Sequence, residues 1–232
     1  VLMGVPPTRF TVTVPGLEVR TMLLVMVLAL LCAVVSILFC RGLHGVERLL
    51  KRTLKNPYLR VAVGAAVLIG LTLLTNGDYN GAGMEVIGQA IAGQADPWAW
   101  VWKLLFTAIT IGCGFKGGEV VPSFFVGATF GCAVSPLLGL PVGFGAAVGL
   151  AAVFCGVTNC PVASTLLAVE LFGAEGLLYF ALACCLSYML SGYQGLYSSQ
   201  TILYSKLKAQ FINVHTNAHH AGELPTEKAQ AK

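Results

Sequence analysis

The feature that most constrains this chain is the length of its stretches without charge. After Glu119, no Asp, Glu, Lys or Arg appears until Glu170. A second charge-free run, Thr21–Cys40, is about as long as the roughly 20 apolar residues that a helix needs to cross a bilayer. The composition agrees, because 10% of the residues are charged and 56% are hydrophobic, whereas soluble domains carry roughly 25% charged residues. We therefore expect an all-α integral membrane protein, embedded in a lipid bilayer.

Basic and aromatic residues indicate how the chain crosses the membrane. Arg and Lys are clustered between Arg41 and Arg60, and the positive-inside rule places that loop, or the helix end it prolongs, on the cytoplasmic side. Three tryptophans between 98 and 102 are typical of a membrane interface. The elements expected over this part are a second crossing at Val61–Thr75, an outer turn at Asn76–Gly83, a short interfacial helix at Ala82–Ala92 and a third apolar segment ending near Gly112.

From Val120 onward, glycine and proline divide the apolar sequence into short pieces. Interrupted helices inside a membrane are tolerated where they line a cavity, and they mark the binding sites of transporters and channels. The glycine pairs Gly127/Gly131 and Gly145/Gly149 predict close helix packing. A last apolar stretch, Gly176–Ser191, leads to an expected amphipathic helix ending near Phe211. Residues 1–212 are thus expected to form the membrane domain, and 213–232 a polar, disordered cytoplasmic tail.

The polar residues exclude several classes of protein. The eight cysteines lie in or beside apolar segments without the paired spacing of zinc or redox sites. The net charge of +4 is small and shows no basic face for nucleic acid. The amino-terminal segment lacks the basic region of a signal peptide, and the chain begins with Val, so we expect a fragment whose upstream part is missing. We expect no enzyme activity and no nucleic-acid partner.

One carboxylate stands at the head of the long charge-free run, in the sequence GGEVVP at 117–122. Pro122 suits the first turn of a helix, and the free amides of Glu119, Val120 and Val121 would then form an anion site at its positive end. Two readings remain open. Glu119 complements the helix dipole, or it is a functional acid within the membrane, often a proton relay.

A second candidate is the tyrosine in GYQGLYSSQTIL, residues 192–203. Tyr197 follows a glycine-rich break, so its phenol could donate a hydrogen bond into a cavity. The simpler alternative is an interfacial tyrosine, because Tyr is common at membrane edges.

Together these two stretches resemble the CLC family of chloride channels and anion/proton antiporters. The filter motif of that family corresponds to Gly118–Pro122, its intermediate helix to Asn159–Gly173 and its anion-binding tyrosine segment to Gly195–Leu203. The resemblance covers about residues 20–210. It implies a CLC-type bundle of tilted and broken transmembrane helices, forming the second half of an inverted repeat. It also implies a homodimer in which each subunit has its own pore, as a multi-pass protein of the cell membrane with a cytoplasmic carboxyl terminus.

Glu119 distinguishes this chain from ordinary CLC sequences, which have isoleucine there. A glutamate at this position of the filter resembles the motif of the fluoride-exporting branch, which reads GEVTP. In this chain Val121 stands in place of the threonine of that motif. The resemblance implies anion binding by Gly117, Gly118, Glu119, Val120, Val121 and Tyr197, with proton coupling through Glu119.

The expected activity is therefore fluoride/proton antiport that exports fluoride from the cytoplasm. A chloride channel or chloride/proton antiporter of the same fold is the main alternative, and an inactive membrane scaffold is a third. The only cofactor implied is a structural Na⁺ near Asn76, Gly77 and Asn80.

Overall fold

The structure is a computed structural model that describes residues 9–208 and 210–217. These residues are mostly helical. The elements are α1 Val19–Thr53, α2 Pro57–Leu74, α3 Met84–Ile91, α4 Ala99–Gly112, α5 Val120–Leu138, α6 Val142–Thr158, α7 Pro161–Phe172, the 3₁₀ turn η1 Ala174–Gly176, α8 Leu177–Leu190, and the strands β1 Thr201–Tyr204 and β2 Phe211–His215. The expected all-α membrane fold is confirmed for the main body of the chain.

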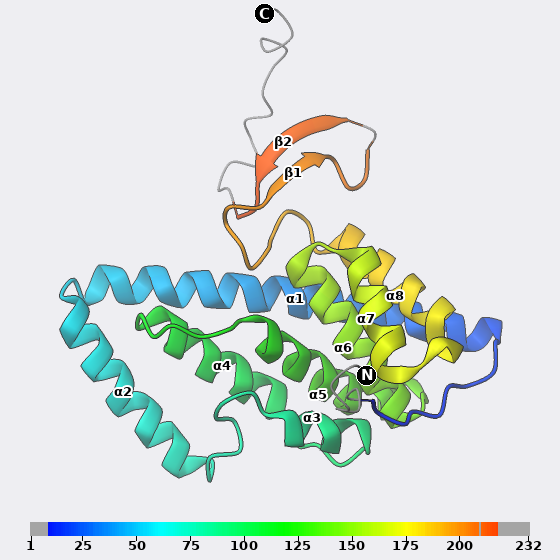
Figure 1. Ribbon diagram of the computed structural model, residues 1–232, viewed down its shortest axis with the longest axis horizontal. Coiled ribbons are helices and arrows are strands. Elements are labelled where there is room, and N and C mark those ends of the chain that lie inside the picture. Colours follow the sequence, from blue (N-terminus) through cyan, green and yellow to red (C-terminus); the bar gives the residue numbers. More distant parts are fainter. Residues whose placement is uncertain (1–8, 209, 218–232) are drawn as a thin grey trace, which may run out of the picture.

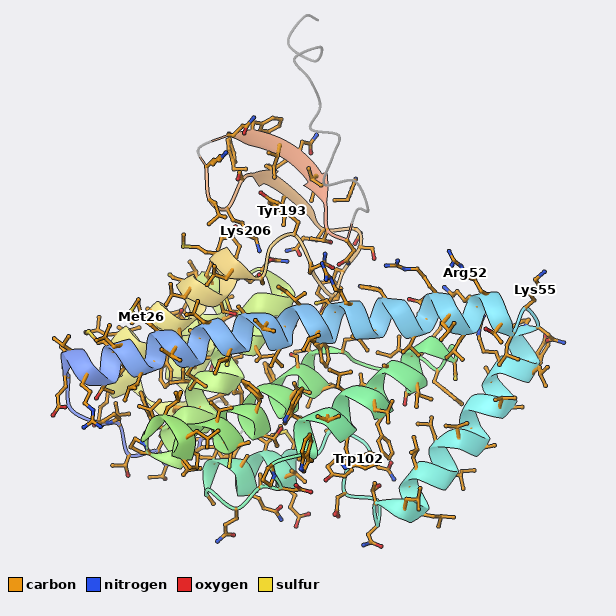
Figure 2. The ribbon with its side chains drawn as sticks, turned by 180° about the vertical axis from the view of Figure 1, so that it is seen from behind. Met26, Arg52, Lys55, Trp102, Tyr193 and Lys206 are labelled. Carbon is orange, nitrogen blue, oxygen red and sulfur yellow. The ribbon has the colours of Figure 1, made fainter. Side chains whose placement is uncertain are left out.

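The first crossing continues without a break into the basic segment, so the cluster of Arg and Lys forms the end of one long helix rather than a loop. α1 therefore runs along the whole bundle, and its basic end carries Arg52 beside the corner where Lys55 leads into α2 (Figures 1 and 2). Asn56 fixes that corner, because its side chain accepts a hydrogen bond from the Tyr58 amide at 3.0 Å and Pro57 opens the next helix.

Helices α5 and α6 pack closely through their glycines, as the paired spacing predicts. A Cβ atom at Gly127 would lie 2.5 Å from the carbonyl oxygen of Gly149, and one at Gly131 would overlap the Gly145 carbonyl. Only glycine permits this approach of two backbones. The contact places α5, and the residues at its start, against the most deeply buried helix of the molecule.

Helix α6 is that buried helix, with α1 on one side and α8 on another. Two serine hydroxyls tie these neighbours to its carbonyls: Ser36 Oγ donates to Val153 O at 3.2 Å, and Ser187 Oγ donates to Ala152 O at 2.6 Å. Because α6 is apolar all round, it needs partners on every face. Figure 1 shows α6, α7 and α8 together at one end of the bundle.

Helix α2 diverges from the bundle, and most of its apolar residues are exposed, although Leu68 and Leu71 pack against the core. Within the described residues, three helices are long and apolar enough to cross a membrane by length and composition, namely α1, α2 and α5. Such an apolar surface must be covered by lipid or by protein.

The prediction of a last amphipathic helix ending near Phe211 is wrong. The structure has an antiparallel hairpin there, in which Thr201 pairs with His215 and Ile202 with Val214. β-branched residues such as Thr201, Ile202 and Val214 favour strands, and the hairpin projects from one side of the bundle (Figure 1). Of the expected polar tail, residues 213–217 belong to the end of this hairpin and the turn after it, and 218–232 lie outside the described residues.

Candidate functional site

Glu119 is the N-cap residue of α5, but its side chain makes no capping hydrogen bond within the described residues. It sits at the end of the α4–α5 linker, residues 113–119, which Arg60 holds by donating from Nε to the Cys113 carbonyl at 3.3 Å. Gly117 and Gly118 are exposed, whereas Glu119 is half-buried. The carboxylate is thus positioned at the positive end of a helix without being used to cap it.

The start of α5 borders a cavity of about 400 Å³. Gly117, Gly118, Val121 and Pro122 line it from the linker and the first turn of the helix. Three of these residues belong to the predicted anion site, and they lie together on one wall. An anion in this cavity would face the amide end of α5.

A buried ammonium group lines the same cavity. Lys103 on α4 is 2% exposed, and its Nζ donates to the carbonyls of Tyr79 at 3.0 Å and Gly81 at 2.6 Å. It also lies 4.9 Å from the centre of the Phe125 ring on α5. A cation in contact with an aromatic face and two carbonyls is stabilised without a carboxylate partner.

Lys103 bears on the Na⁺ that the resemblance implies, because its Nζ already donates hydrogen bonds to two carbonyl oxygens of the same outer turn. In that turn, Asn80 Oδ1 accepts from Thr72 Oγ1 at 3.1 Å, and the Gly77 carbonyl accepts from the Asn80 amide at 3.1 Å. Among the described residues, no group of three His, Cys, Asp or Glu side chains could hold a metal. A Na⁺ site near Asn76, Gly77 and Asn80 stays a prediction, and it would depend on the remaining backbone oxygens.

Glu119 also interacts with the basic half of α1. It interacts electrostatically with His44 and Glu47, and with the buried thiol of Cys40. Cys40, His44 and Glu47 are spaced by four and three residues, so they share one face of the helix. The filter acid is therefore adjacent in sequence to residues that line the cavity at α5, and it interacts electrostatically with a polar stripe on α1.

Tyr197 lies in the segment between α8 and β1. Its side chain is 48% exposed, and its carbonyl accepts a hydrogen bond from Thr216 Oγ1. The preceding Leu196 is buried, and its amide donates to the Val157 carbonyl at 2.9 Å. No hydrogen bond or ring contact between described residues joins Tyr197 to Glu119, so a joint anion site for these two side chains stays a prediction.

Asn159 holds the segment of Tyr197 against the end of α6. It adopts a left-handed conformation with φ of 58°, which ends the helix. Its Nδ2 donates to Gln194 O at 3.0 Å, and its Oδ1 accepts from Lys206 Nζ. Lys206 also donates to Ser191 Oγ at 3.1 Å, and Figure 2 shows it beside Tyr193 where the hairpin meets the bundle. The Asn159 side chain thus links three segments.

Comparison with known proteins gives the same fold and the same arrangement of elements. Residues 1–192 match the model of a family described as voltage gated chloride channel. The chain belongs to the voltage-gated chloride channel, or CLC, family. This confirms the resemblance that the filter and tyrosine segments indicate.

Two relatives of this CLC chain have names or structures that bear on its branch. It is 35% identical, over 212 residues, to a protein of Pseudomonas syringae pv. tomato named chloride/fluoride channel protein, covering 88% of this chain and 47% of that protein. It superposes with a TM-score of 0.79 and 32% identity on the crystal structure of a CLC-type fluoride/proton antiporter, covering 84% of this chain and 50% of that one. The chain therefore spans about half the length of these relatives.

A third relative covers less of the chain. An uncharacterized protein of Methanocaldococcus jannaschii is 33% identical over 75 residues, which is 32% of this chain and 19% of that protein.

Sequence reasoning did not single out His44 or Lys103. Both left a signal. Lys103 is a lone cation within the apolar segment AWVWKLLF, and an ionisable residue in such a segment is a candidate for function. His44 stands at helical spacing from Cys40 and Glu47, although only the structure shows that this face meets Glu119.

Proposed function

We propose that the protein to which this CLC half belongs transports fluoride across the membrane, most simply as a fluoride/proton antiporter that exports fluoride from the cytoplasm. The position of Glu119 supports this proposal. Glu119 is an acid at the start of α5, half-buried, uncapped within the described residues, and adjacent to a cavity lined by Gly117, Gly118 and Val121.

The chemistry of fluoride explains why such an acid is useful. Fluoride is a strong hydrogen-bond acceptor, and its conjugate acid is weak enough to re-form near neutral pH. A neutral Glu119 can donate a hydrogen bond to the anion, whereas a charged Glu119 repels it. A switch between these states couples the exit of an anion to the entry of a proton.

The names of the two larger relatives support the same substrate. One is a chloride/fluoride channel protein and the other a CLC-type fluoride/proton antiporter. Chloride transport by the same fold is the second candidate, and Val121 favours it, because the hydroxyl that the fluoride branch carries at this position is absent. The backbone amide of residue 121 is retained.

The experiment that tests the proposal uses the full-length protein in liposomes loaded with either fluoride or chloride. Electrode measurements of anion efflux and a pH-sensitive dye report the two fluxes together. We expect fluoride efflux to exceed chloride efflux and to drive protons inward. Rapid chloride efflux without proton movement would contradict antiport and favour a chloride channel.

We propose a cell-membrane location with the basic end of α1 and the carboxyl terminus in the cytoplasm, because Arg and Lys gather in that helix end. We also propose a homodimer, for which α7 and α8 carry the exposed apolar residues Val162, Leu166 and Leu178.

A further inference from the structure

The polar stripe on α1 extends from the interior of the bundle to the surface. Its members are Cys40, His44, Glu47 and Lys51, at helical spacings of four, three and four. Lys51 Nζ lies 2.6 Å from Glu47 Oε1, and His44 Nδ1 lies 3.9 Å from Glu47 Oε2. The side chains become more exposed along the stripe, since Cys40 is buried, His44 is 16% exposed and Glu47 is 33% exposed.

A second cavity is lined by His44. It has a volume of about 320 Å³ and is separate from the cavity beside the filter. Its lining residues are His44, Glu47, Arg48 and Lys51 from α1, and Ser198, Thr216 and Asn217 from the segments around the hairpin. His44 lines this cavity and also interacts electrostatically with Glu119, so it is a group that can link the filter acid to the cavity.

The hydrogen bonds of His44 suit a group that gains and loses a proton. Its Nε2 lies 3.2 Å from the Gly195 carbonyl and 3.1 Å from Asn217 Nδ2. A carbonyl accepts only, whereas an amide nitrogen donates only, so the two contacts serve different forms of the ring. A protonated Nε2 donates to Gly195, and a bare Nε2 accepts from Asn217.

The orientation of the Asn217 amide is fixed independently of the histidine. Its Oδ1 accepts from the Gly195 amide at 3.1 Å, and its Nδ2 donates to the Gly195 carbonyl at 2.7 Å. If the amide were turned over, its nitrogen would face the Gly195 amide, which is also a donor, and its oxygen would face the Gly195 carbonyl, which is also an acceptor. His44 therefore has a partner in both protonation states, and a proton can come and go without leaving a polar atom unpaired.

From this arrangement we propose that His44 carries protons between Glu119 and the cavity at Glu47, a role that rests on the proposed antiport. In fluoride export, the neutral Glu119 gives its proton to the neutral imidazole and becomes a carboxylate. The resulting imidazolium then releases a proton to Glu47 or to water in the cavity and becomes neutral again. The carboxylates on both sides stabilise the imidazolium between these two steps.

The charged groups around His44 agree with this role. On α1 they are Glu47, Arg48 and Lys51, together with the thiol of Cys40, and the α4–α5 linker contributes Glu119. The residues that line the cavity from the hairpin side, Ser198, Thr216 and Asn217, are uncharged. Lys51 Nζ pairs with the Glu47 carboxylate beside the ring.

The test compares His44→Gln with His215→Gln in the full-length protein. Glutamine keeps a donor and an acceptor but cannot carry a proton, and His215 is an exposed histidine on β2 that contacts Thr201. In liposomes we expect His44→Gln to slow fluoride-driven proton movement by about tenfold or more, as the loss of a positioned acid–base group does. Fluoride binding by calorimetry should stay within about twofold of the unchanged protein, and His215→Gln should alter neither measurement.

A further readout separates a proton carrier from a structural histidine. Added imidazole should restore part of the lost flux by entering the cavity. Unchanged proton flux in His44→Gln would overturn the relay and leave antiport standing. An equal loss of fluoride binding and flux would make His44 structural. Fluoride transport without any proton movement in the unchanged protein would remove antiport itself.

Discussion

At the residue scale, the proposed coupling of fluoride export to proton entry depends on the protonation of Glu119. Glu119→Gln keeps the shape and the hydrogen-bonding capacity of the side chain but fixes it in a neutral state. We expect fluoride-driven proton movement to be lost in liposomes, while calorimetric anion binding persists. The matched control is Glu170→Gln, which changes an exposed acid on α7 in the same way. If Glu119→Gln couples like the unchanged protein, Glu119 only complements the dipole of α5.

Tyr197 offers a second test at this scale. Tyr197→Phe removes one hydroxyl donor, and if that hydroxyl reaches the anion, binding should weaken by about 1–3 kcal/mol. Calorimetry of fluoride binding measures the change. Tyr193→Phe is the control, because the Tyr193 hydroxyl donates to Ser205 Oγ in the hairpin at 3.1 Å. Identical affinities for both variants would assign Tyr197 to the membrane interface, in agreement with its 48% exposure.

Lys103 gives a prediction about stability. Lys103→Met keeps the length of the side chain but leaves the carbonyls of Tyr79 and Gly81 without their buried donor. Hydrogen bonds to a charged group contribute about 1.5–3 kcal/mol, so we expect the free energy of unfolding to fall by about that amount. Thermal unfolding in detergent should show a lower midpoint, and Lys55→Met, at an exposed site, should not. Equal midpoints would mean that water replaces the ammonium group without cost.

At the scale of elements, the contact between α5 and α6 determines where the filter lies. Gly131→Ala places a methyl group against the Gly145 carbonyl, with backbone on both sides and no room to move. Overpacking of this kind costs about 1–3 kcal/mol. Gly70→Ala on exposed α2 has nothing within 4 Å of the new atom and serves as the control. Thermal unfolding should separate the two variants, and a stable Gly131→Ala would contradict close packing.

The elements also show how far the sequence alone leads. Apolar runs, glycine spacing and the proline positions predict the helices from α1 to α8, because each depends on local composition. The hairpin is missed, since its pairing of Thr201 with His215 depends on contacts across a loop rather than on periodicity. The filter acid is found from its motif. Its neighbour His44 is not, because the two approach each other only when α1 packs beside the α4–α5 linker.

At the scale of the whole molecule, the described bundle carries exposed apolar surface on more than one side. α2 exposes Leu59, Val67, Ile69 and Leu73, and α7 and α8 expose Val162, Leu166 and Leu178. Since the chain spans about half the length of its relatives, these surfaces must be divided among lipid, a second subunit and the remainder of the protein. The proposed homodimer assigns α7 and α8 to the second subunit.

The dimer is tested by placing a bulky side chain where the two subunits would meet. Leu166→Trp together with Leu178→Trp should prevent the flat apolar contact, because an overfilled interface loses its shape complementarity. In the full-length protein we expect cross-linking and light scattering to report monomers, with fluoride transport retained, since each subunit would hold its own pore. Leu203→Trp on β1 is the control, exposed but outside the proposed contact. A dimer that survives the paired substitution would move the interface to another face, with α2 the next candidate because its apolar surface is equally open.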